Sequence, residues 1–295
     1  MVSVLMITHN RSEELIDTVK NILEQTHKNI EIIIVENGSL DAVIQKNREL
    51  LKDFDLQYIV SNENLGVSGG RNLALKEANG DVIIEIDDDA VFDDPKSIDN
   101  VISFFEKNPT IGIQAFQIIN YYTRKITNEE YPFRDKSRDS NSEGYTTWFI
   151  GAGHAFRKEL IDEIGLYRDF FPWGSEEQDF SVRALNAGYE IFYNPEIIVY
   201  HKKSPNGRIE NRIKFGGIAL KNRIKFTLLN YPFRYALIHS IIRSTQSVIK
   251  FKSIRVLVLA INHLYNEFSY IVDNRKVIGK DTRKKLIERD GQLYY

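Results

Sequence analysis

Apolar runs and amphipathic segments alternate along the first 90 residues of the chain. Short runs rich in Val and Ile predict β-strands, and segments with apolar residues at helical spacing predict helices between them. The predicted strands span residues 2–7, 30–35, 56–60 and 82–86, and the predicted helices cover residues 12–25, a segment ending near 52, and 70–78. This βαβαβαβ order predicts an α/β fold with a mainly parallel sheet flanked by helices.

The pattern becomes less regular further along. Asp94 and Pro95 suit the N-cap and first position of a helix that ends near Lys107. Strand-like sequence follows at 111–118, 145–157, 189–193 and 196–200, and a helix is predicted at 176–187. Residues 120–144 are polar and lack periodicity, which is typical of a functional lid or a disordered segment.

Beyond Lys203, apolar residues mix with many Lys and Arg residues. Their spacing predicts three helices at roughly 208–229, 233–250 and 254–272. We therefore expect two parts, an α/β domain over residues 1–203 and a basic helical region over 204–295.

Composition narrows the class of protein. A chain of 295 residues with 42% hydrophobic residues can form one large α/β domain with an appendage. It contains no cysteine, which excludes disulfides and a thiol nucleophile. The N-terminus enters a strand pattern without the basic segment of a signal peptide, and no long uncharged apolar run occurs. We expect a cytoplasmic protein.

The formal net charge of −2 conceals a strong asymmetry. Residues 202–295 contain 20 Lys and Arg against 6 Asp and Glu, a net charge of +14, whereas residues 1–201 carry −16. Such a division suggests that the basic end meets something anionic. The hypothesis is that it docks on anionic lipid headgroups, on the inner face of the cell membrane. The equally favoured alternative is a helical appendage that packs on the α/β domain or forms a homodimer.

Three consecutive carboxylates, Asp87, Asp88 and Asp89, end the predicted strand at 82–86. Like charges this close repel unless a cation neutralises them, and oxygen ligands suit Mg²⁺ or Mn²⁺. A solvated acidic turn is an equally good interpretation of the run alone. The turns after the first, second and fourth strands should, however, gather at one edge of the sheet, where ligands bind in such folds.

Two further elements add to this edge. Glu176, Glu177 and Asp179 stand at the start of a helix, and His201 ends a β-branched strand. Two carboxylates and an imidazole around a diphosphate could hold Mn²⁺ or Mg²⁺, and a separate carboxylate could act as general base. The alternatives are simple: the glutamates, Glu176 above all, could satisfy the helix dipole, and His201 could be a hydrogen-bonded histidine.

Other residues allow two interpretations. Arg71 could be a surface ion-pair residue, and Trp148 and Trp173 could belong to the core or stack on sugar rings. The glycines at 66, 69 and 70 do not form a dinucleotide-binding motif, and no phosphate-binding P-loop motif occurs.

Taken in order, these segments resemble the inverting family 2 glycosyltransferases with the GT-A fold. The resemblance covers residues 2–201 and is closest in motif to rhamnosyl- and galactofuranosyl-transferases. It rests on Thr-His-Asn-Arg at 8–11, Val-Glu-Asn-Gly-Ser at 35–39, Asn-Leu-Gly-Val-Ser-Gly-Gly-Arg-Asn at 64–72, Asp-Asp-Asp at 87–89, Gly-Ser-Glu-Glu-Gln-Asp-Phe at 174–180 and Tyr-His at 200–201.

The resemblance implies specific roles for these residues. A nucleotide-binding half over about 1–118 and an acceptor half over about 119–203 would form the catalytic domain. Asp89 and His201 would bind the metal, and Glu177 would be the general base, with Asp179 as the alternative. The residues implied to hold the nucleotide are Thr8, Arg11, Glu36, Asn64, Gly66, Arg71, Asp87 and Asp88.

The chain departs from the family pattern at Glu36 and Glu177, where Asp is usual. The implied reaction moves a sugar from a UDP-, dTDP- or GDP-sugar to a saccharide or lipid-linked saccharide, in bacterial polysaccharide or glycoconjugate synthesis. The alternatives are a sugar-1-phosphate nucleotidylyltransferase, which would want a Gly-rich basic loop after the first strand, and a non-catalytic carbohydrate-binding protein. Nothing in the basic region resembles a nucleic-acid-reading module.

Overall fold

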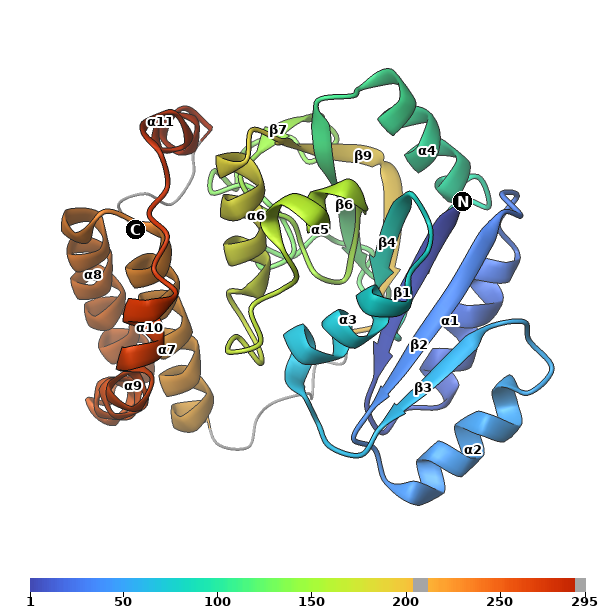
Figure 1. Ribbon diagram of the computed structural model, residues 1–295, viewed down its shortest axis with the longest axis horizontal. Coiled ribbons are helices and arrows are strands. Elements are labelled where there is room, and N and C mark those ends of the chain that lie inside the picture. Colours follow the sequence, from blue (N-terminus) through green and yellow to red (C-terminus); the bar gives the residue numbers. More distant parts are fainter. Residues whose placement is uncertain (204–211, 290–295) are drawn as a thin grey trace.

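The computed structural model describes residues 1–203 and 212–289 and shows a sheet with helices on both faces and a layer of C-terminal helices at one end (Figure 1). The strands are β1 (Val2–Thr8), β2 (Ile30–Asn37), β3 (Gln57–Ser61), β4 (Val82–Ile86), β5 (Ala90–Phe92), β6 (Ile111–Asn120), β7 (Gly144–Thr146), β8 (Gly153–Arg157) and β9 (Glu190–His201). The helices are α1 (Glu13–Leu23), α2 (Asp41–Leu51), α3 (Gly66–Glu77), α4 (Ser97–Lys107), α5 (Glu159–Ile164), α6 (Glu176–Asn186), α7 (Arg212–Asn230), α8 (Phe233–Phe251), α9 (Arg255–Asn266), α10 (Phe268–Asp273) and α11 (Lys280–Glu288).

Within the described residues, one sheet runs in the order β3-β2-β1-β4-β8-β6-β9-β5, and β7 also pairs with β9. Strands β1 to β4 are parallel, as the βαβ pattern predicts. The second half is mixed, because β8 runs antiparallel to β4 and β6 while β6 and β9 are parallel. The expected α/β fold is confirmed, but its sheet is mixed rather than mainly parallel.

Alternating side chains along the strands fill two cores. Val4, Ile32 and Ile34 face the core under α1 and α4, whereas Leu5 and Ile33 face the core under α3 and α6. Each fully buried Ile or Val contributes roughly 1.5–3 kcal/mol, so burial on both faces determines the register of these strands.

Several predicted boundaries are wrong by a few residues. Helix α3 begins at Gly66 rather than residue 70. Helix α4 begins at Ser97 rather than at Asp94 and Pro95, because the Asp94 side chain accepts a hydrogen bond from the Lys96 amide in a turn before the helix. The predicted strands at 189–193 and 196–200 are one strand, β9. Conversely, the polar segment 121–143 contains no helix or strand, as expected.

Helix α7 joins the C-terminal helices to the α/β region. Its Phe226 and Leu229 share a core with Phe171 and Phe180 beside α6. On its other side, a Cβ at Gly216 would lie 2.7 Å from the Phe251 ring and one at Gly217 2.9 Å from Leu259, so glycines allow α8 and α9 to approach closely. The helices therefore form an attached layer rather than a separate body.

The predicted three C-terminal helices become five within the described residues, because the third is divided into α9 and α10 and α11 follows. Residues 208–211 of the first predicted helix lie outside the described ranges. Within those ranges, no helix has the length and apolar character needed to cross a lipid bilayer.

Candidate active site

A cavity of about 710 Å³ opens at the carboxyl ends of β1, β2 and β4. Its size suits a ligand as large as a nucleotide. The turns after the three strands do gather there, as the strand order predicts. Residues that line it include Thr8, His9, Arg11, Asn37, Asn64, Gly66, Arg71, Asp87, Asp88, Asp89, Glu130, Trp173, Glu176, Glu177 and His201.

Asp87, Asp89 and His201 form a cluster that could hold a metal ion, with ligand atoms within 4.8 Å of one another. Strand pairing brings them together: β5 follows the Asp87–Asp89 turn directly, and its Ala90 pairs with His201 of β9. His201 Nε2 lies 3.2 Å from Asp89 Oδ1 and 3.8 Å from Asp87 Oδ2.

These groups fit a divalent cation. Two carboxylates and one imidazole are ligands that Mg²⁺ or Mn²⁺ accepts, and three protein ligands leave positions for phosphate oxygens and water. Adjacent ligands at about 2.1 Å from an octahedral ion lie about 3 Å apart, close to the Asp89–His201 separation. The cluster adds Asp87 to the predicted pair.

A carboxylate that sequence reasoning missed supports His201 from behind. Glu130 is buried, and its Oε1 accepts a hydrogen bond from His201 Nδ1 at 2.7 Å. Burial alone would lower the pKa of His201, but its hydrogen bonds with Asp89 and Glu130 raise that pKa to about 10. Glu130 lies in the irregular segment 121–143, where no periodicity could have indicated it.

Arg11 supplies positive charge to the other side of the aspartate run. Its Nη1 lies 2.7 Å from Asp88 Oδ1 and 2.6 Å from Asp89 Oδ2. Burial nevertheless raises the pKa of Asp88 to about 7. Asp88 thus pairs with Arg11, whereas Asp87 joins the candidate metal ligands.

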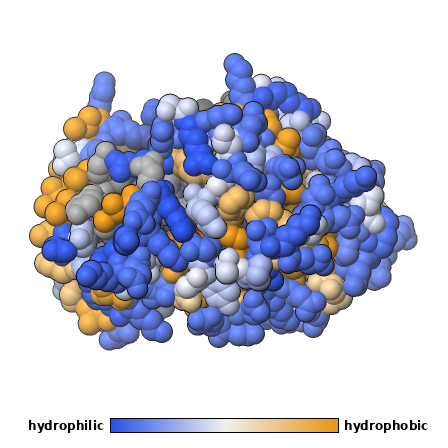
Figure 2. Space-filling model, turned by 90° about the horizontal axis from the view of Figure 1, so that it is seen from above, coloured by the Kyte–Doolittle hydropathy of each residue, from blue (hydrophilic) through white to orange (hydrophobic). Residues whose placement is uncertain are grey.

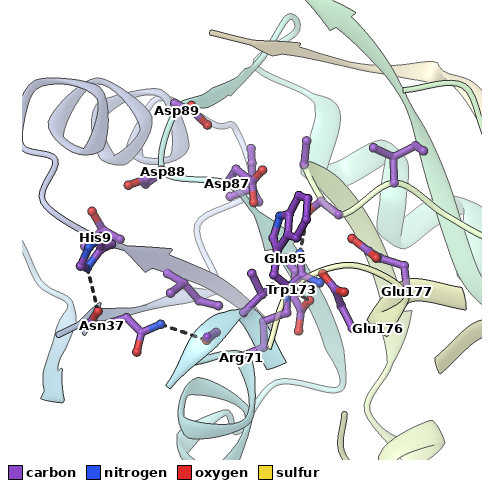
Figure 3. Close-up of a pocket in the computed structure, with 18 of the residues that line it drawn as sticks. His9, Asn37, Arg71, Glu85, Asp87, Asp88, Asp89, Trp173, Glu176 and Glu177 are labelled. Atoms are coloured by element: carbon purple, nitrogen blue, oxygen red, sulfur yellow. Dashed lines mark hydrogen bonds and ion pairs between the residues drawn. The ribbon is translucent and has the colours of Figure 1, made fainter. Parts of the chain in front are cut away.

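Arg71 is buried and is not a surface ion-pair residue. Its Nε lies 3.1 Å from Glu85 Oε2 in an ion pair, and its Nη2 donates a hydrogen bond to the Gly151 carbonyl at 3.1 Å. Glu85 also accepts a hydrogen bond from Tyr167 at 2.9 Å and lies 3.2 Å from His154. This buried network holds the Arg71 guanidinium at the wall of the cavity (Figure 3).

Glu176 and Glu177 line the cavity from the first turn of α6, across from Asp88 and Asp89 in the view of Figure 3. Burial and the charge of Glu177 raise the pKa of Glu176 well above its usual range. Burial also raises the pKa of Glu177, while the positive charge of Arg71 opposes that shift. Both carboxylates therefore bind a proton more strongly than exposed glutamates do, which favours a general base at this position.

Asp179, the alternative base, lies elsewhere. It is buried outside the cavity lining and receives hydrogen bonds of 2.8 Å from Arg168, Arg183 and Asn230. Asn230 belongs to α7, so Asp179 joins helix α6 to the C-terminal helices. Its geometry is that of a structural carboxylate.

Glu36 also departs from its expected position. It is fully buried at the end of β2 and is not among the lining residues of the cavity. Its carboxylate accepts hydrogen bonds from Ser39, Asn47 and Tyr58. The structure places Asn37, the next residue, at the cavity wall instead.

The loop at 64–66 is held in place by Asn37. The Asn37 side chain donates to the Gly66 carbonyl and accepts from the Leu65 amide, both at 2.9 Å. Gly66 has φ +72°, and a Cβ there would lie 2.6 Å from the Pro172 carbonyl oxygen. Only glycine suits this position, which brings Asn64 and the aromatic loop to the same cavity.

The two tryptophans differ in position. Trp173 lines the cavity, and its carbonyl accepts a hydrogen bond from Asn222 of α7 at 2.7 Å. Its ring meets Phe215 edge-on with centroids 6.0 Å apart. Trp148 is half-buried and is not among the lining residues.

Comparison with known families decides the class of the chain. Residues 3–165 match the family described as glycosyl transferase family 2. The chain belongs to this family. It is therefore a glycosyltransferase, and the resemblance drawn from its ordered motifs is confirmed. The rhamnosyl- and galactofuranosyl-transferase branch stays a prediction.

Relatives in this family support the assignment. The chain is 32% identical to an uncharacterized protein of Haemophilus influenzae over 56% of this chain and 91% of that one. It is 36% identical to the Escherichia coli UDP-Glc:alpha-D-GlcNAc-diphosphoundecaprenol beta-1,3-glucosyltransferase WfaP over 42% of this chain and 47% of the relative. The poly-beta-1,6-N-acetyl-D-glucosamine synthase of Staphylococcus epidermidis is 31% identical over 68% of this chain and 49% of the relative. The chain thus spans about half the length of these two characterised relatives.

Solved structures confirm the fold of this glycosyltransferase. The mannosyltransferase PcManGT from Pyrobaculum calidifontis, in complex with GDP-Man and Mn²⁺, has a TM-score of 0.58 at 17% identity and covers 99% of this chain and 84% of its own. GalNAc-T7 with UDP, GalNAc and Mn²⁺ has a TM-score of 0.63 at 16% identity and covers 79% of this chain and 48% of its own.

Proposed function

We propose that this glycosyltransferase is metal-dependent and inverting, and that it moves a sugar from a nucleoside-diphosphate donor to a hydroxyl acceptor. The observation that carries the proposal is the meeting of two groups in one cavity. One is the Asp87, Asp89 and His201 cluster, and the other is Glu177 with its raised pKa.

The cluster side of the cavity suits the donor diphosphate. A divalent cation held by Asp87, Asp89 and His201 would neutralise the charge of the departing nucleoside diphosphate. Glu130 orients the His201 ring, as carboxylates behind metal-binding histidines do. Thr8, Arg11, Asn64, Gly66, Arg71 and Asp88 line the same cavity, and we assign them to nucleotide binding. The similar solved structures contain GDP-Man with Mn²⁺ and UDP with Mn²⁺, which supports this assignment.

Glu177 acts as the general base in this proposal. Its carboxylate takes the proton of the acceptor hydroxyl, and the acceptor oxygen forms a bond to C1 of the donor sugar. The bond between C1 and the diphosphate oxygen breaks, and its electron pair leaves with the nucleoside diphosphate. Attack from the face opposite the leaving group inverts the anomeric configuration. Because Asp179 is fully engaged by Arg168, Arg183 and Asn230, we assign the base to Glu177 alone.

The acceptor side is formed by the residues around Trp173. Its ring lines the cavity near Glu176 and Glu177, where the apolar face of a sugar could stack. We propose a saccharide or lipid-linked saccharide acceptor in bacterial polysaccharide or glycoconjugate synthesis. The names of the Escherichia coli and Staphylococcus epidermidis relatives support this class. Family membership favours glycosyl transfer over the nucleotidylyltransferase and carbohydrate-binding alternatives.

Donor hydrolysis tests the proposal without knowledge of the acceptor. A panel of UDP-, dTDP- and GDP-sugars is incubated with the protein and Mn²⁺, Mg²⁺ or EDTA, and released nucleoside diphosphate is measured. We expect release from one donor class with metal only, and a loss of at least about 100-fold in Asp89→Ala.

The matched control is Asp93→Ala, an exposed carboxylate four residues away and outside the cavity lining. It should retain wild-type release. Equal release by Asp89→Ala and wild type, or equal release in EDTA, would contradict a metal-dependent site at this cluster.

A further inference from the structure

Helices α8 and α9 expose apolar side chains to an unusual degree. Ile249 is 70% exposed and Tyr265 is 82% exposed, and Ile238, Ile241, Val258 and Ile261 are each more than 40% exposed. We call these six residues the outer apolar face. Figure 2 shows hydrophobic residues gathered at the end of the molecule that Figure 1 assigns to these helices.

The outer apolar face follows helical spacing, so it is a surface and not a scatter of single residues. On α9, Val258, Ile261 and Tyr265 recur at intervals of three and four residues and lie on one side. The opposite side of α9 buries Val256 and Ala260 and packs Leu257 and Leu264 partly against the neighbouring helices. Apolar side chains therefore lie on both sides of α9, whereas a water-exposed helix normally has one polar face.

Charge on the same helices is of one sign. Residues 212–266 contain ten Lys and Arg and no Asp or Glu. Arg234, Lys250, Lys252 and Arg255 are exposed on or between α8 and α9, and none of the four forms an ion pair with a described residue. A helix that only faces water would normally carry acidic residues as well.

We propose that the outer face of α8 and α9 docks on an anionic lipid surface. Apolar side chains would enter the headgroup boundary, and Lys and Arg would meet lipid phosphates or other anionic headgroups, as in interfacial amphipathic helices. Docking rather than spanning agrees with the absence of a membrane-crossing helix among the described residues.

The charge pattern favours lipid over a second copy of the chain. A two-fold interface that uses this face would bring the basic surfaces of two copies together, including Lys250, Lys252 and Arg255 of each. No acidic residue of α8 or α9 could compensate that repulsion. An anionic bilayer supplies the opposite charge and an apolar interior together.

Helix α7 connects the docking surface to the active site. One side of α7 packs on α8 and α9, and its Asn222 and Phe215 contact Trp173 at the cavity. Docking would thus bring the acceptor side of the cavity close to the lipid surface. The docking proposal itself does not depend on the proposed reaction, because the surface lies outside the catalytic cavity.

Vesicle co-sedimentation tests the proposal. Full-length protein is mixed with vesicles of phosphatidylcholine, alone or with phosphatidylglycerol, at low and high NaCl. We expect binding to the phosphatidylglycerol vesicles at low salt and its decline as salt screens the charges. The variant K250E/K252E/R255E should lower the partition coefficient at least about tenfold. The variant I241S/I249S/Y265S should lower it as well.

Control variants place the same kinds of change on the α/β region. K20E/K46E/K76E reverses three exposed lysines that form no ion pair with a described residue, and L40S replaces an exposed leucine. Both should bind vesicles as wild type does, with unchanged thermal unfolding in all variants.

Three results would overturn the proposal. They are no sedimentation with phosphatidylglycerol vesicles at low salt, wild-type binding by K250E/K252E/R255E, and a vesicle-free dimer by light scattering that I241S/I249S/Y265S dissociates. The readout is pelleted protein, so failure of donor hydrolysis would leave this result unaffected.

Discussion

The α/β region and the C-terminal helices distribute apolar and charged groups in opposite ways. In the α/β region, strands bury Val and Ile on both faces, and charged groups converge at the carboxyl edge. In the C-terminal helices, Lys221 and Lys225 are buried against Glu267, while Ile249 and Tyr265 face outward. Buried charges organise the cavity and the contact between the two regions, which we call the joint and which includes Asp179, Lys225 and Glu267. Apolar surface is exposed where a lipid surface or a partner can cover it.

The joint between the two regions shows the first half of this rule. Lys225 has a fully buried side chain that lies 4.8 Å from the centroids of both Phe170 and Phe171 and donates to the Phe170 carbonyl. Burial lowers its pKa to about 8. These contacts hold the aromatic loop that carries Trp173, so the C-terminal helices help to shape the cavity.

Substitutions of Glu177 and Asp179, both on α6, should distinguish the cavity from the joint most clearly. Glu177→Gln should lower sugar transfer by about 1000-fold, because the amide cannot accept the acceptor proton. Nucleotide affinity and thermal stability should stay close to wild type. Transfer assays with the identified donor, calorimetry with the nucleotide and thermal unfolding measure the three quantities. Retained transfer would move the base to another residue.

Asp179→Asn, two residues along α6, should have the opposite effect: it should lower stability and leave activity intact. It removes the charge that Arg168 and Arg183 share at the joint, and should lower the free energy of unfolding by about 3 kcal/mol. Urea unfolding measures this loss. Below the unfolding transition, donor hydrolysis should persist. A fully stable Asp179→Asn protein without transfer would assign catalysis to Asp179 and remove the distinction drawn here.

Arg71→Met should leave Glu85 without its buried ion-pair partner and lower stability, and its smallest expected effect is a shift in the pH dependence of transfer. Arg71, Glu176 and Asp87 are the charged groups that act on Glu177. Loss of the guanidinium charge raises the pKa of Glu177, so the acid limb of the pH–rate profile should move to higher pH by about one unit. The profile of kcat/KM measures it. The matched variant Arg71→Lys, which keeps a positive charge, should move the limb less. A shift to lower pH would contradict a base controlled by Arg71.

Particular residues show what could be predicted. Ile83–Ile86 followed by Asp87–Asp89 predicted a strand that ends in a charged turn, and the cavity contains that turn. His201 was predicted as a ligand from the resemblance, and the structure places it beside Asp89. Glu130 was missed because it reaches His201 across 71 residues from a segment without periodicity. Glu36, expected at the nucleotide, is held by Ser39, Asn47 and Tyr58 beneath the cavity wall.

Local sequence by itself determined the strands and helices of the first half, the single-sign charge of residues 212–266 and the family. Periodicity and motif order act over a few residues, and both are readable in one dimension. Tertiary structure decided which carboxylate serves which purpose: Asp87 rather than Asp88 in the candidate metal cluster, Glu177 at the cavity and Asp179 at the joint. It also decided which helix faces stay exposed. Those outcomes depend on contacts between residues far apart in the chain, and hydrogen bonding, burial and pKa follow from the partners that folding supplies.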